Sequence, residues 1–367
     1  MKKILTITCH NVYNHGATLQ QMALLVYLKS LNFDAKTINY KPKYLSNHYK
    51  LWLVNNEKFE KNIFLKFIYL SLKLPSRLLE RVRKNNFDQF EKKYLDVLPQ
   101  KYSTNKELKN NLPEADFYIT GSDQVWNSFF DNGKDPAFYL DFVPDNKPKI
   151  AYAASFAIDS IEPSLTNFVK EKVSRLQHIS VREKSGVQIL ENLGFEKVSQ
   201  VIDPVFLMNA EYWTTNFVKP ISQDYVFIYD FDGNENIKKT AIELSKKHNL
   251  KIFTVNERIN YASKKYVNSG PEIFLSLVHH AKYVLTNSFH AVAFSLIFNK
   301  KFLVFNRTEK INTRMRDLLQ MVELSEILVE INETKDIDLI PFDFNNSNKI
   351  ISNKVLESKK FLEEALK

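Results

Sequence analysis

The sequence contains one cysteine, seven glycines and no long hydrophobic run among its 367 residues. The single cysteine, Cys9, excludes an intramolecular disulfide and a cysteine-based metal cluster, and is typical of a cytoplasmic protein. No apolar stretch approaches the roughly 20 residues that a membrane-spanning helix needs. The N-terminal segment MKKILTITCHNVYNHG lacks a small-residue cleavage site, so it predicts a first strand rather than a signal peptide. We therefore expect a cytoplasmic protein, either free or peripheral at the inner face of the cell membrane.

The scarcity of glycine bears on nucleotide binding. The chain contains neither GxGxxG nor GxxxxGK[ST], which disfavours a standard dinucleotide fold and a P-loop. Gly16 and Gly121 both follow predicted strands, where ligand-binding loops lie in open α/β sheets. An ordinary tight turn explains each glycine equally well.

Positive charge exceeds negative charge, with 51 Lys and Arg against 42 Asp and Glu and a formal net charge of +9. A basic protein suits an anionic substrate, an anionic membrane or nucleic acid. The sequence has no zinc-finger spacing, no RNP-like aromatic motif and no convincing helix-turn-helix, so we expect no nucleic acid partner.

The chain repeats a short β-branched run, a polar or glycine-containing turn and a segment of helical periodicity. Strands that alternate with helices in this way predict an α/β fold with parallel sheets. After the first strand, we expect strands at residues 34–40, 116–121, 149–155, 178–182, 198–204, 225–231, 251–255, 283–287 and 301–306.

The length of the chain favours two domains over one. Clear periodicity is lost between residues 205 and 222. We therefore predict an N-terminal domain over residues 1–205, a C-terminal domain over 206–345, and a last helix over 346–367 that crosses back onto the first domain.

Residues 50–95 differ from the rest of the first domain. Aromatic and aliphatic residues alternate there with Lys and Arg, as in a basic amphipathic helix. Such a helix can lie in the interface of an anionic membrane. The alternative is an inserted helical hairpin whose apolar face packs on its own domain, and the sequence leaves both open.

Two predicted strands end in charged residues. The segment YITGSDQVWN places Ser122 and Asp123 at a strand end, where Asp123 can accept a proton from a substrate hydroxyl or cap the following segment. The segment SVREKSG places Arg182 at another strand end. An arginine there can bind a carboxylate or phosphate through two hydrogen bonds, or pair with Glu183 or Asp203.

The segment VLTNSFHAVAF, residues 284–294, joins a predicted strand to a predicted helix. Asn287 or Ser288 can cap that helix, whose free N–H groups and dipole favour an anion. His290 falls in the first turn, where an imidazole can donate a proton near neutral pH. The alternative is a histidine packed at the cap without a ligand. Further along, Arg314 and Arg316 cannot point the same way on a helix, so we expect at most one to face this site.

Seven segments form a pattern that is fairly specific when taken together. They are NxGAxLQ at 14–20, GSDQVWN at 121–127, AYAASF at 151–156, SVREKSG at 180–186, DPVFLM at 203–208, NSFHAVAFSLIFNKKF at 287–302 and NTRMRDLL at 312–319. In this order they resemble the polysaccharide pyruvyltransferase family. The resemblance implies a GT-B-like fold, in which two Rossmann-like domains face each other across a cleft.

The resemblance also implies a reaction. Family members take phosphoenolpyruvate as donor and install a pyruvate ketal on a sugar of a cell-surface polysaccharide or its lipid-linked precursor, with no metal or other cofactor. The catalytic residues implied are His290, as the acid that protonates the enol carbon, and Asp123, which would orient or deprotonate the acceptor. The donor-binding residues implied are Arg182, Asn287, Ser288 and Arg314. Those on the acceptor side are Asn14, His15, Gly16 and Ser122.

One position departs from the family pattern. Many members carry an arginine two residues before the histidine, where this chain has Ser288. Two other functions therefore stay open: a GT-B glycosyltransferase that uses a nucleotide sugar, and a non-catalytic protein that binds glycan or membrane.

Overall fold

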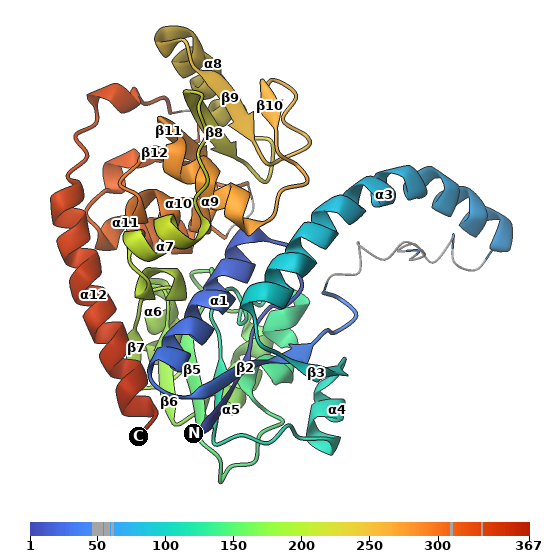
Figure 1. The fold of residues 1–367 in the computed structure, drawn as a ribbon. Helices are drawn as coiled ribbons and strands as arrows, with labels where there is room; N and C mark the ends of the chain where they lie inside the picture. The colour runs from blue at the N-terminus through green and yellow to red at the C-terminus, as the bar shows by residue number, and fades with distance from the viewer. Residues whose placement is uncertain (46–53, 55–58, 60–61, 309–310, 332) are drawn as a thin grey trace.

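The computed structural model describes residues 1–45, 54, 59, 62–308, 311–331 and 333–367, and shows an α/β fold built on two parallel sheets (Figure 1). The α/β class with parallel sheets predicted from the sequence is therefore confirmed. In the first sheet the strand order is β3 (Val97–Tyr102), β2 (Asp34–Tyr40), β1 (Lys3–Ile7), β4 (Phe117–Thr120), β5 (Lys149–Ala154), β6 (His178–Val181) and β7 (Val198–Gln200).

The second sheet repeats this arrangement in the later part of the chain. Its order is β10 (Lys264–Lys265), β9 (Lys251–Thr254), β8 (Tyr225–Tyr229), β11 (Tyr283–Thr286), β12 (Lys301–Phe305) and β13 (Leu328–Val329). Every strand pair in both sheets is parallel. In each sheet the first strand in the chain lies inside and the order reverses beside it, as in Rossmann-like folds.

Helices connect the strands and cover the sheets. They are α1 (His15–Ser30), α3 (Ile63–Tyr94), α4 (Asn105–Asn110), α5 (Thr166–Val173), α6 (Lys184–Asn192), α7 (Ala210–Phe217), α8 (Glu235–His248), α9 (Pro271–His280), α10 (Phe289–Ile297), α11 (Thr313–Met321) and α12 (Phe344–Ala365). Short 3₁₀ turns include η5 (Pro204–Leu207). The strand predicted at 198–204 is shorter than expected, because Pro204 begins this turn and cannot continue the backbone hydrogen bonding of a strand.

Helix α1 joins the two halves of the molecule. Asn14 caps it, since its side-chain oxygen accepts hydrogen bonds from the N–H groups of Gly16 and Ala17 at 3.0 and 3.2 Å. The helix is buried along most of its length and packs against η5, α9 and α10. Residues of α1, β8 and α10 accordingly belong to one continuous hydrophobic core.

Helix α3 projects from the body as an arm of 32 residues (Figure 1). It occupies most of the predicted 50–95 insertion; of the earlier part of that insertion, residues 50–53, 55–58 and 60–61 lie outside the described chain. Only the C-terminal part of α3 packs on the body, where Phe87 and Phe90 are buried. No helix in the part of the chain that the structure describes combines the length and apolar character needed to cross a bilayer.

Helix α12 runs from the second half back to the first (Figure 1). Near its start, Asn346 donates a hydrogen bond to Glu323 at 2.7 Å. Near its end, Ser358 Oγ accepts a hydrogen bond from the Ile202 N–H at 2.9 Å, and Glu363 accepts one from the Tyr27 hydroxyl at 3.2 Å. These contacts hold the C-terminal helix against both halves.

Candidate active site

The carboxyl ends of the two sheets meet at a shared interface. Asp203 follows β7 of the first sheet and His290 follows β11 of the second, and their side chains lie 3.6 Å apart (Nε2 to Oδ2). In open α/β folds, ligands bind beyond the carboxyl ends of the strands, where the strand order reverses. This interface is therefore where the fold itself favours a ligand site.

A buried ion pair lies at the centre of the interface. Arg182, which directly follows β6, donates a hydrogen bond from Nη1 to Asp203 Oδ2 at 2.5 Å. Both side chains are almost completely buried. Burial acts to lower the pKa of Arg182, but the neighbouring carboxylates, chiefly Asp203, outweigh it and raise that pKa. Arg182 thus remains charged, and the pairing with Asp203 left open by the sequence is present.

Arg314 and Asp123 extend the cluster. Asp123 Oδ1 lies 3.7 Å from both Arg182 Nη2 and Arg314 Nη1. The two guanidinium groups also lie over the ring of Phe289, 4.1 Å and 5.7 Å from its centroid. Burial and the charge of Arg182 lower the pKa of Arg314 to about 10. Two like charges are therefore held close together in a site of low solvent access.

Several donors in this cluster have no hydrogen-bond partner. They are His290 Nε2, Arg182 Nε and Nη2, and Arg314 Nε, all buried and without a hydrogen bond to any residue that the structure describes. The nearest carboxylate oxygens lie 3.6 Å from His290 Nε2 and 3.7 and 3.9 Å from Arg182 Nη2 and Nε, beyond hydrogen-bond distance. Buried polar groups are nearly always paired, so a group of unpaired donors needs an explanation. An anionic ligand that accepts from them would provide one.

The space between these side chains is small in this structure. The cavity bounded by Arg182, Asp203, Phe289 and Arg314 measures about 10 Å³. A cavity of that size has room for about one water molecule. A substrate can therefore enter only if the two halves or their side chains move apart.

Gly16 contacts the imidazole of His290. A Cβ atom at position 16 would lie 2.0 Å from His290 Nδ1 and 2.1 Å from Cγ. Only glycine allows the first turn of α1 to approach this closely. Gly16 was predicted on the acceptor side, but here it is buried against the imidazole and positions it.

His15 was also expected on the acceptor side. Its ring is fully buried, stacked on Phe274 at 5.0 Å and 9° and tilted against Phe87 at 5.1 Å. Neither ring nitrogen has a partner among the described residues, and burial lowers the pKa of His15 well below its usual value. The side chain is a packing residue and does not reach an acceptor in this structure.

The predicted residues around β4 and β11 are placed as follows. Ser122 Oγ donates to the Ala153 carbonyl at 2.9 Å and lies 3.4 Å from Asp203. Asn287 binds the start of the loop after β8, accepting from Phe231 N–H at 2.9 Å and donating to Asp230 at 2.7 Å. Neither Asn287 nor Ser288 caps α10 through its side chain. The Asn287 side chain is hydrogen-bonded to the loop after β8, and the Ser288 side chain forms no capping hydrogen bond.

The charged residues split as helical spacing predicts. Arg314 is buried in the cluster, whereas Arg316 forms an ion pair with Asp159 at 2.7 Å. Asp123 does not cap the next segment; its backbone adopts the left-handed region with φ of 74°. Such a conformation is uncommon outside glycine and turns the carboxylate towards the two guanidinium groups.

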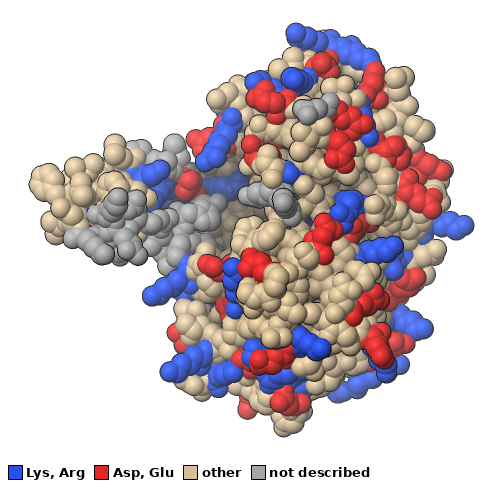
Figure 2. Space-filling view, turned by 180° about the vertical axis from the view of Figure 1, so that it is seen from behind, with Lys and Arg blue, Asp and Glu red and all other residues tan. Residues whose placement is uncertain are grey.

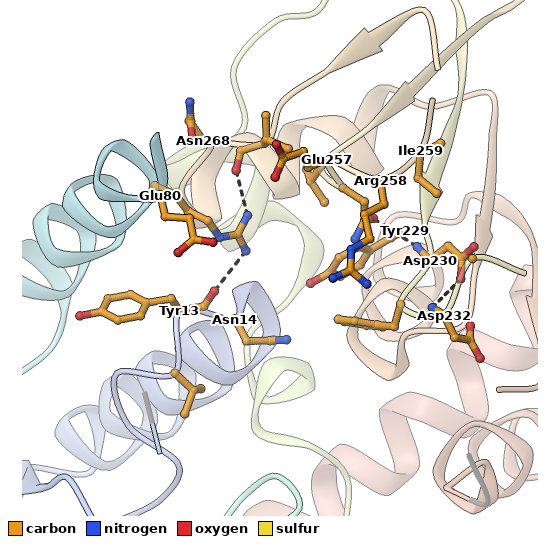
Figure 3. A pocket seen from close by; sticks show the side chains of 17 residues that line it. Tyr13, Asn14, Glu80, Tyr229, Asp230, Asp232, Glu257, Arg258, Ile259 and Asn268 are labelled. Carbon is orange, nitrogen blue, oxygen red and sulfur yellow. Dashed lines mark hydrogen bonds between the residues drawn. The ribbon is translucent and has the colours of Figure 1, made fainter. Parts of the chain in front are cut away.

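A larger cavity, of about 690 Å³, is lined by residues outside the cluster (Figure 3). Asn14 from the start of α1, Glu80 and Arg83 from α3, and Asp230 and Arg258 from the second sheet contribute to its walls. Glu80 and Tyr13 lie on one side in Figure 3, and Tyr229, Asp230 and Arg258 lie on the other. Of the predicted site residues, Asn14 alone lines this cavity.

Sequence reasoning missed two residues of the cluster as functional candidates. Asp203 was considered only as a structural partner of Arg182, although the run VIDP already placed a carboxylate at a strand end. Phe289 has no polar group and looks like an ordinary core residue until both arginines are seen against its ring. Metal binding has no candidate, because the described residues contain no cluster of three or more possible ligands.

Several solved structures are similar to this chain at low sequence identity. A UDP complex of MnaA from S. aureus matches with a TM-score of 0.51 and 14% identity, covering 98% of this chain and 90% of that one. UDP-N-acetylglucosamine 2-epimerase from Rickettsia bellii gives 0.49 and 11%, covering 98% and 96%. E. coli heptosyltransferase WaaC with ADP gives 0.41 and 11%, covering 96% and 99%. The first match, together with the two sheets, shows a GT-B-type fold.

The sequence comparison is more specific. No curated protein shows significant similarity to the chain. The sequence model of the family described as polysaccharide pyruvyl transferase matches residues 14–309. That range takes in Asn14, Asp123, Arg182, Asp203 and His290. The chain therefore belongs to the polysaccharide pyruvyl transferase family and is a transferase.

Proposed function

We propose that this protein transfers a pyruvyl group from phosphoenolpyruvate to two hydroxyl groups of a sugar, forming a pyruvate ketal and releasing phosphate. The observation that carries the proposal is the set of buried, unpaired donors of Arg182, Arg314 and His290 at the interface of the two sheets. Phosphoenolpyruvate carries a carboxylate and a phosphate, and guanidinium groups bind both by paired hydrogen bonds.

His290 acts as the general acid in this proposal. Its Nε2 lies 3.6 Å from Asp203 Oδ2 and forms no hydrogen bond with a described residue. Transfer of its proton to the methylene carbon of the donor leaves positive character on the adjacent carbon, which bears the phosphate and the carboxylate. Gly16 and Asp203 hold the imidazole in place. The backbone of Gly16 packs directly against the ring at Nδ1, because glycine has no side chain there, and the Asp203 carboxylate lies near Nε2.

Asp123 acts on the acceptor. Its carboxylate is less deeply buried than that of Asp203, and it can take the proton of a sugar hydroxyl that attacks the positive carbon. A second hydroxyl of the same sugar then attacks that carbon and displaces phosphate, and its proton passes to the neutral His290, which restores the acid. The proton held by Asp123 leaves with the phosphate. The products are the ketal and inorganic phosphate, so atoms and charge balance without a redox step.

Arg314 supports the donor site where this chain departs from its family. Ser288 stands where many members have arginine, and its short side chain supplies no charge. Arg314 approaches the same place from α11, over the ring of the adjacent Phe289. This guanidinium is therefore the cation that takes over the role of the missing arginine.

The decisive experiment is phosphate release from phosphoenolpyruvate in the presence of acceptor. His290→Ala should abolish release while phosphoenolpyruvate binding, measured by calorimetry, and the melting temperature are largely retained. Full release in this variant would remove His290 from the mechanism. Binding of UDP in place of phosphoenolpyruvate would instead favour a nucleotide-sugar glycosyltransferase.

The arm formed by α3 extends the proposal to the location of the acceptor. Its outer part exposes Ile63, Phe64, Phe67 and Leu72, with 73–86% of each side chain accessible. Lys66, Lys73 and Arg81 occur on the same helix, and Figure 2 shows basic residues on the arm beside a largely uncharged tip. Exposed aromatic and aliphatic residues with basic neighbours suit an anionic membrane surface, where a lipid-linked acceptor would be located.

Sedimentation with phosphatidylglycerol vesicles tests the arm. The double variant Phe64→Ser/Phe67→Ser should reduce vesicle binding about tenfold or more. The double variant Lys66→Glu/Lys73→Glu should reduce both vesicle binding and the dependence of that binding on salt concentration. Arg77 is left unchanged because its side chain is buried. Retained vesicle binding in both double variants would refute this role of the arm.

A further inference from the structure

The 690 Å³ cavity is walled by three separate parts of the chain. The loop before α1 contributes Tyr13 and Asn14, α3 contributes Glu80 and Arg83, and the second sheet contributes the rest from the ends of β8, β9 and β10 and the loops that follow them (Figure 3). Its volume lies within the range of about 300–1,000 Å³ that is usual for small-molecule sites. The cavity is large enough for a ligand as it stands, unlike the space between Arg182 and Arg314.

Hydrogen bonds fix these walls to one another. Arg83 donates from Nη2 to the Tyr13 carbonyl at 3.1 Å and from Nη1 to the Val267 carbonyl at 3.0 Å (Figure 3). Asn86 donates to the Asn268 carbonyl at 2.6 Å. One turn of α3 is therefore tied to both halves of the protein, and the cavity is formed before any ligand binds.

Two carboxylates of the wall are already used by the protein. Asp230 accepts from the N–H groups of Asp232 and Asn234 at 3.1 and 2.7 Å, in addition to Asn287. Asp232 also binds Asn287, and accepts from the Thr308 N–H at 2.9 Å. These residues shape the loop, and they are not the groups that would bind a ligand.

Three charged side chains of the wall are left for a ligand. Glu80, Glu257 and Arg258 form no side-chain hydrogen bond or ion pair with any residue in the described part of the chain. Burial and the charge of Glu257 raise the pKa of Glu80. The cavity thus offers two acceptors of like charge and one donor.

This combination selects the chemistry of the ligand. A carboxylate only accepts hydrogen bonds and a guanidinium only donates them, whereas a hydroxyl does both. Four carboxylates and two guanidinium groups line the wall, so its net charge is negative and disfavours a diphosphate.

The cavity also lies next to the proposed reacting group. Asn14 lines it, and Gly16, two residues further along α1, touches the His290 imidazole. On the opposite side, Asn287 binds the cavity loop through Asp230 and precedes His290 by three residues. A sugar held in the cavity would have its hydroxyl groups beside the donor site.

We propose that this cavity binds the acceptor as an uncharged, hydroxyl-rich sugar, with Glu80 and Glu257 accepting from its hydroxyl groups and Arg258 donating to them. The inference rests on the proposed pyruvyl transfer, and it assigns the acceptor to a site that the second sheet and α3 share. A cavity at these strand ends would suit an anionic nucleotide if the charged side chains left for a ligand were mainly basic. Here two of the three are glutamates.

A glycan array tests the assignment with neutral, uronic-acid-containing and sialylated oligosaccharides as probes, beside UDP measured by calorimetry. We expect binding to neutral glycans alone, weakened about tenfold or more by Glu80→Gln with Glu257→Gln and by Arg258→Met, since each removes charge-assisted hydrogen bonds. Glu211→Gln, an exposed change on α7 away from the cavity, is the matched control and should bind as the wild type does.

Each other outcome overturns the inference. Binding restricted to acidic glycans or to UDP contradicts the neutral ligand, and neutral binding that survives the cavity variants contradicts the site. Absence of binding to every glycan contradicts both. Calorimetry with phosphoenolpyruvate on the same variants separates this result from the proposed function, because the donor should bind them as it binds the wild type.

Discussion

Replacement of Gly16 by alanine tests whether α1 positions the imidazole. In a helix, alanine is favoured over glycine by about 1 kcal/mol, so this change is ordinarily stabilising. Here the new Cβ would meet His290 Nδ1, Cγ and Cβ at 2.0, 2.1 and 2.6 Å. Extra atoms in a packed interior cost about 1–3 kcal/mol. Contacts this short against a buried ring place the cost at the upper end, and we expect a net loss of about 1–2 kcal/mol.

The assay combines urea denaturation with phosphate release from phosphoenolpyruvate. Displacement of the imidazole should lower release at least about tenfold, which corresponds to 1.4 kcal/mol of transition-state stabilisation, while phosphoenolpyruvate affinity falls less. Gly186→Ala is the control: this buried glycine also lies near the start of a helix, but its Cβ would come no closer than 3.3 Å to Val181. That variant should keep its activity, and its stability should change by less than that of Gly16→Ala, because its contacts at 3.3–3.5 Å are tight but do not overlap. A Gly16→Ala protein with wild-type stability and turnover would refute the reasoning.

Three further predictions follow from the buried groups. Asp203→Asn removes the carboxylate to which buried Arg182 donates its hydrogen bond and should cost about 3 kcal/mol in denaturant unfolding. Equal stability would show that the pair is not coupled. Burial acts to raise the pKa of Asp203, but His290 and Arg182 lower that pKa below its usual value. The stabilisation that the carboxylate provides is therefore full above the unfolded carboxyl pKa of about 3.9 and is lost as the pH falls below that value. The difference in unfolding free energy between wild type and Asp203→Asn should narrow in acid, and a difference that does not depend on pH would contradict this explanation. Asp123→Asn should lower the rate of phosphate release with little change in phosphoenolpyruvate affinity, and His15→Phe should leave acceptor KM unchanged, since a rise would return His15 to the acceptor site.

Much of the fold could be predicted because buried parallel strands and their helices leave strong periodic patterns. Strands such as 251–255 and 283–287 match β9 and β11 to within one residue at their ends. The strands that were not predicted, β3, β10 and β13, lie at sheet edges. They are short or carry charge and Pro99, because a strand with one neighbour needs neither a continuous apolar run nor every N–H group.

The site was predictable only as far as chemistry shows in residue types. His290, Arg182, Arg314 and Asp123 stand at strand or helix ends and meet at the interface. The sequence alone does not predict which helix or strand of the folded protein a given side chain contacts. His15, one residue from the helix cap, therefore looked like a ligand and proved to be enclosed by Phe87 and Phe274.

The same limit applies to the acceptor side. The cavity lined by Glu80 and Arg258 depends on α3 crossing both halves, and no local pattern in the sequence contains that long-range contact. In the sequence, Glu80 and Arg258 resemble ordinary charged surface residues. Only the structure, which places both in the wall of one cavity with Asn14, indicates a function that can be tested.

The most direct measurement is a crystal structure of the protein soaked with phosphoenolpyruvate. We expect the donor between the two sheets, with its phosphate and carboxylate on Arg182 and Arg314, its methylene carbon facing His290 Nε2, and the 10 Å³ space between them widened to hold it. Phosphoenolpyruvate bound in the 690 Å³ cavity instead, with the Arg182–Asp203 crevice still closed, would contradict the account.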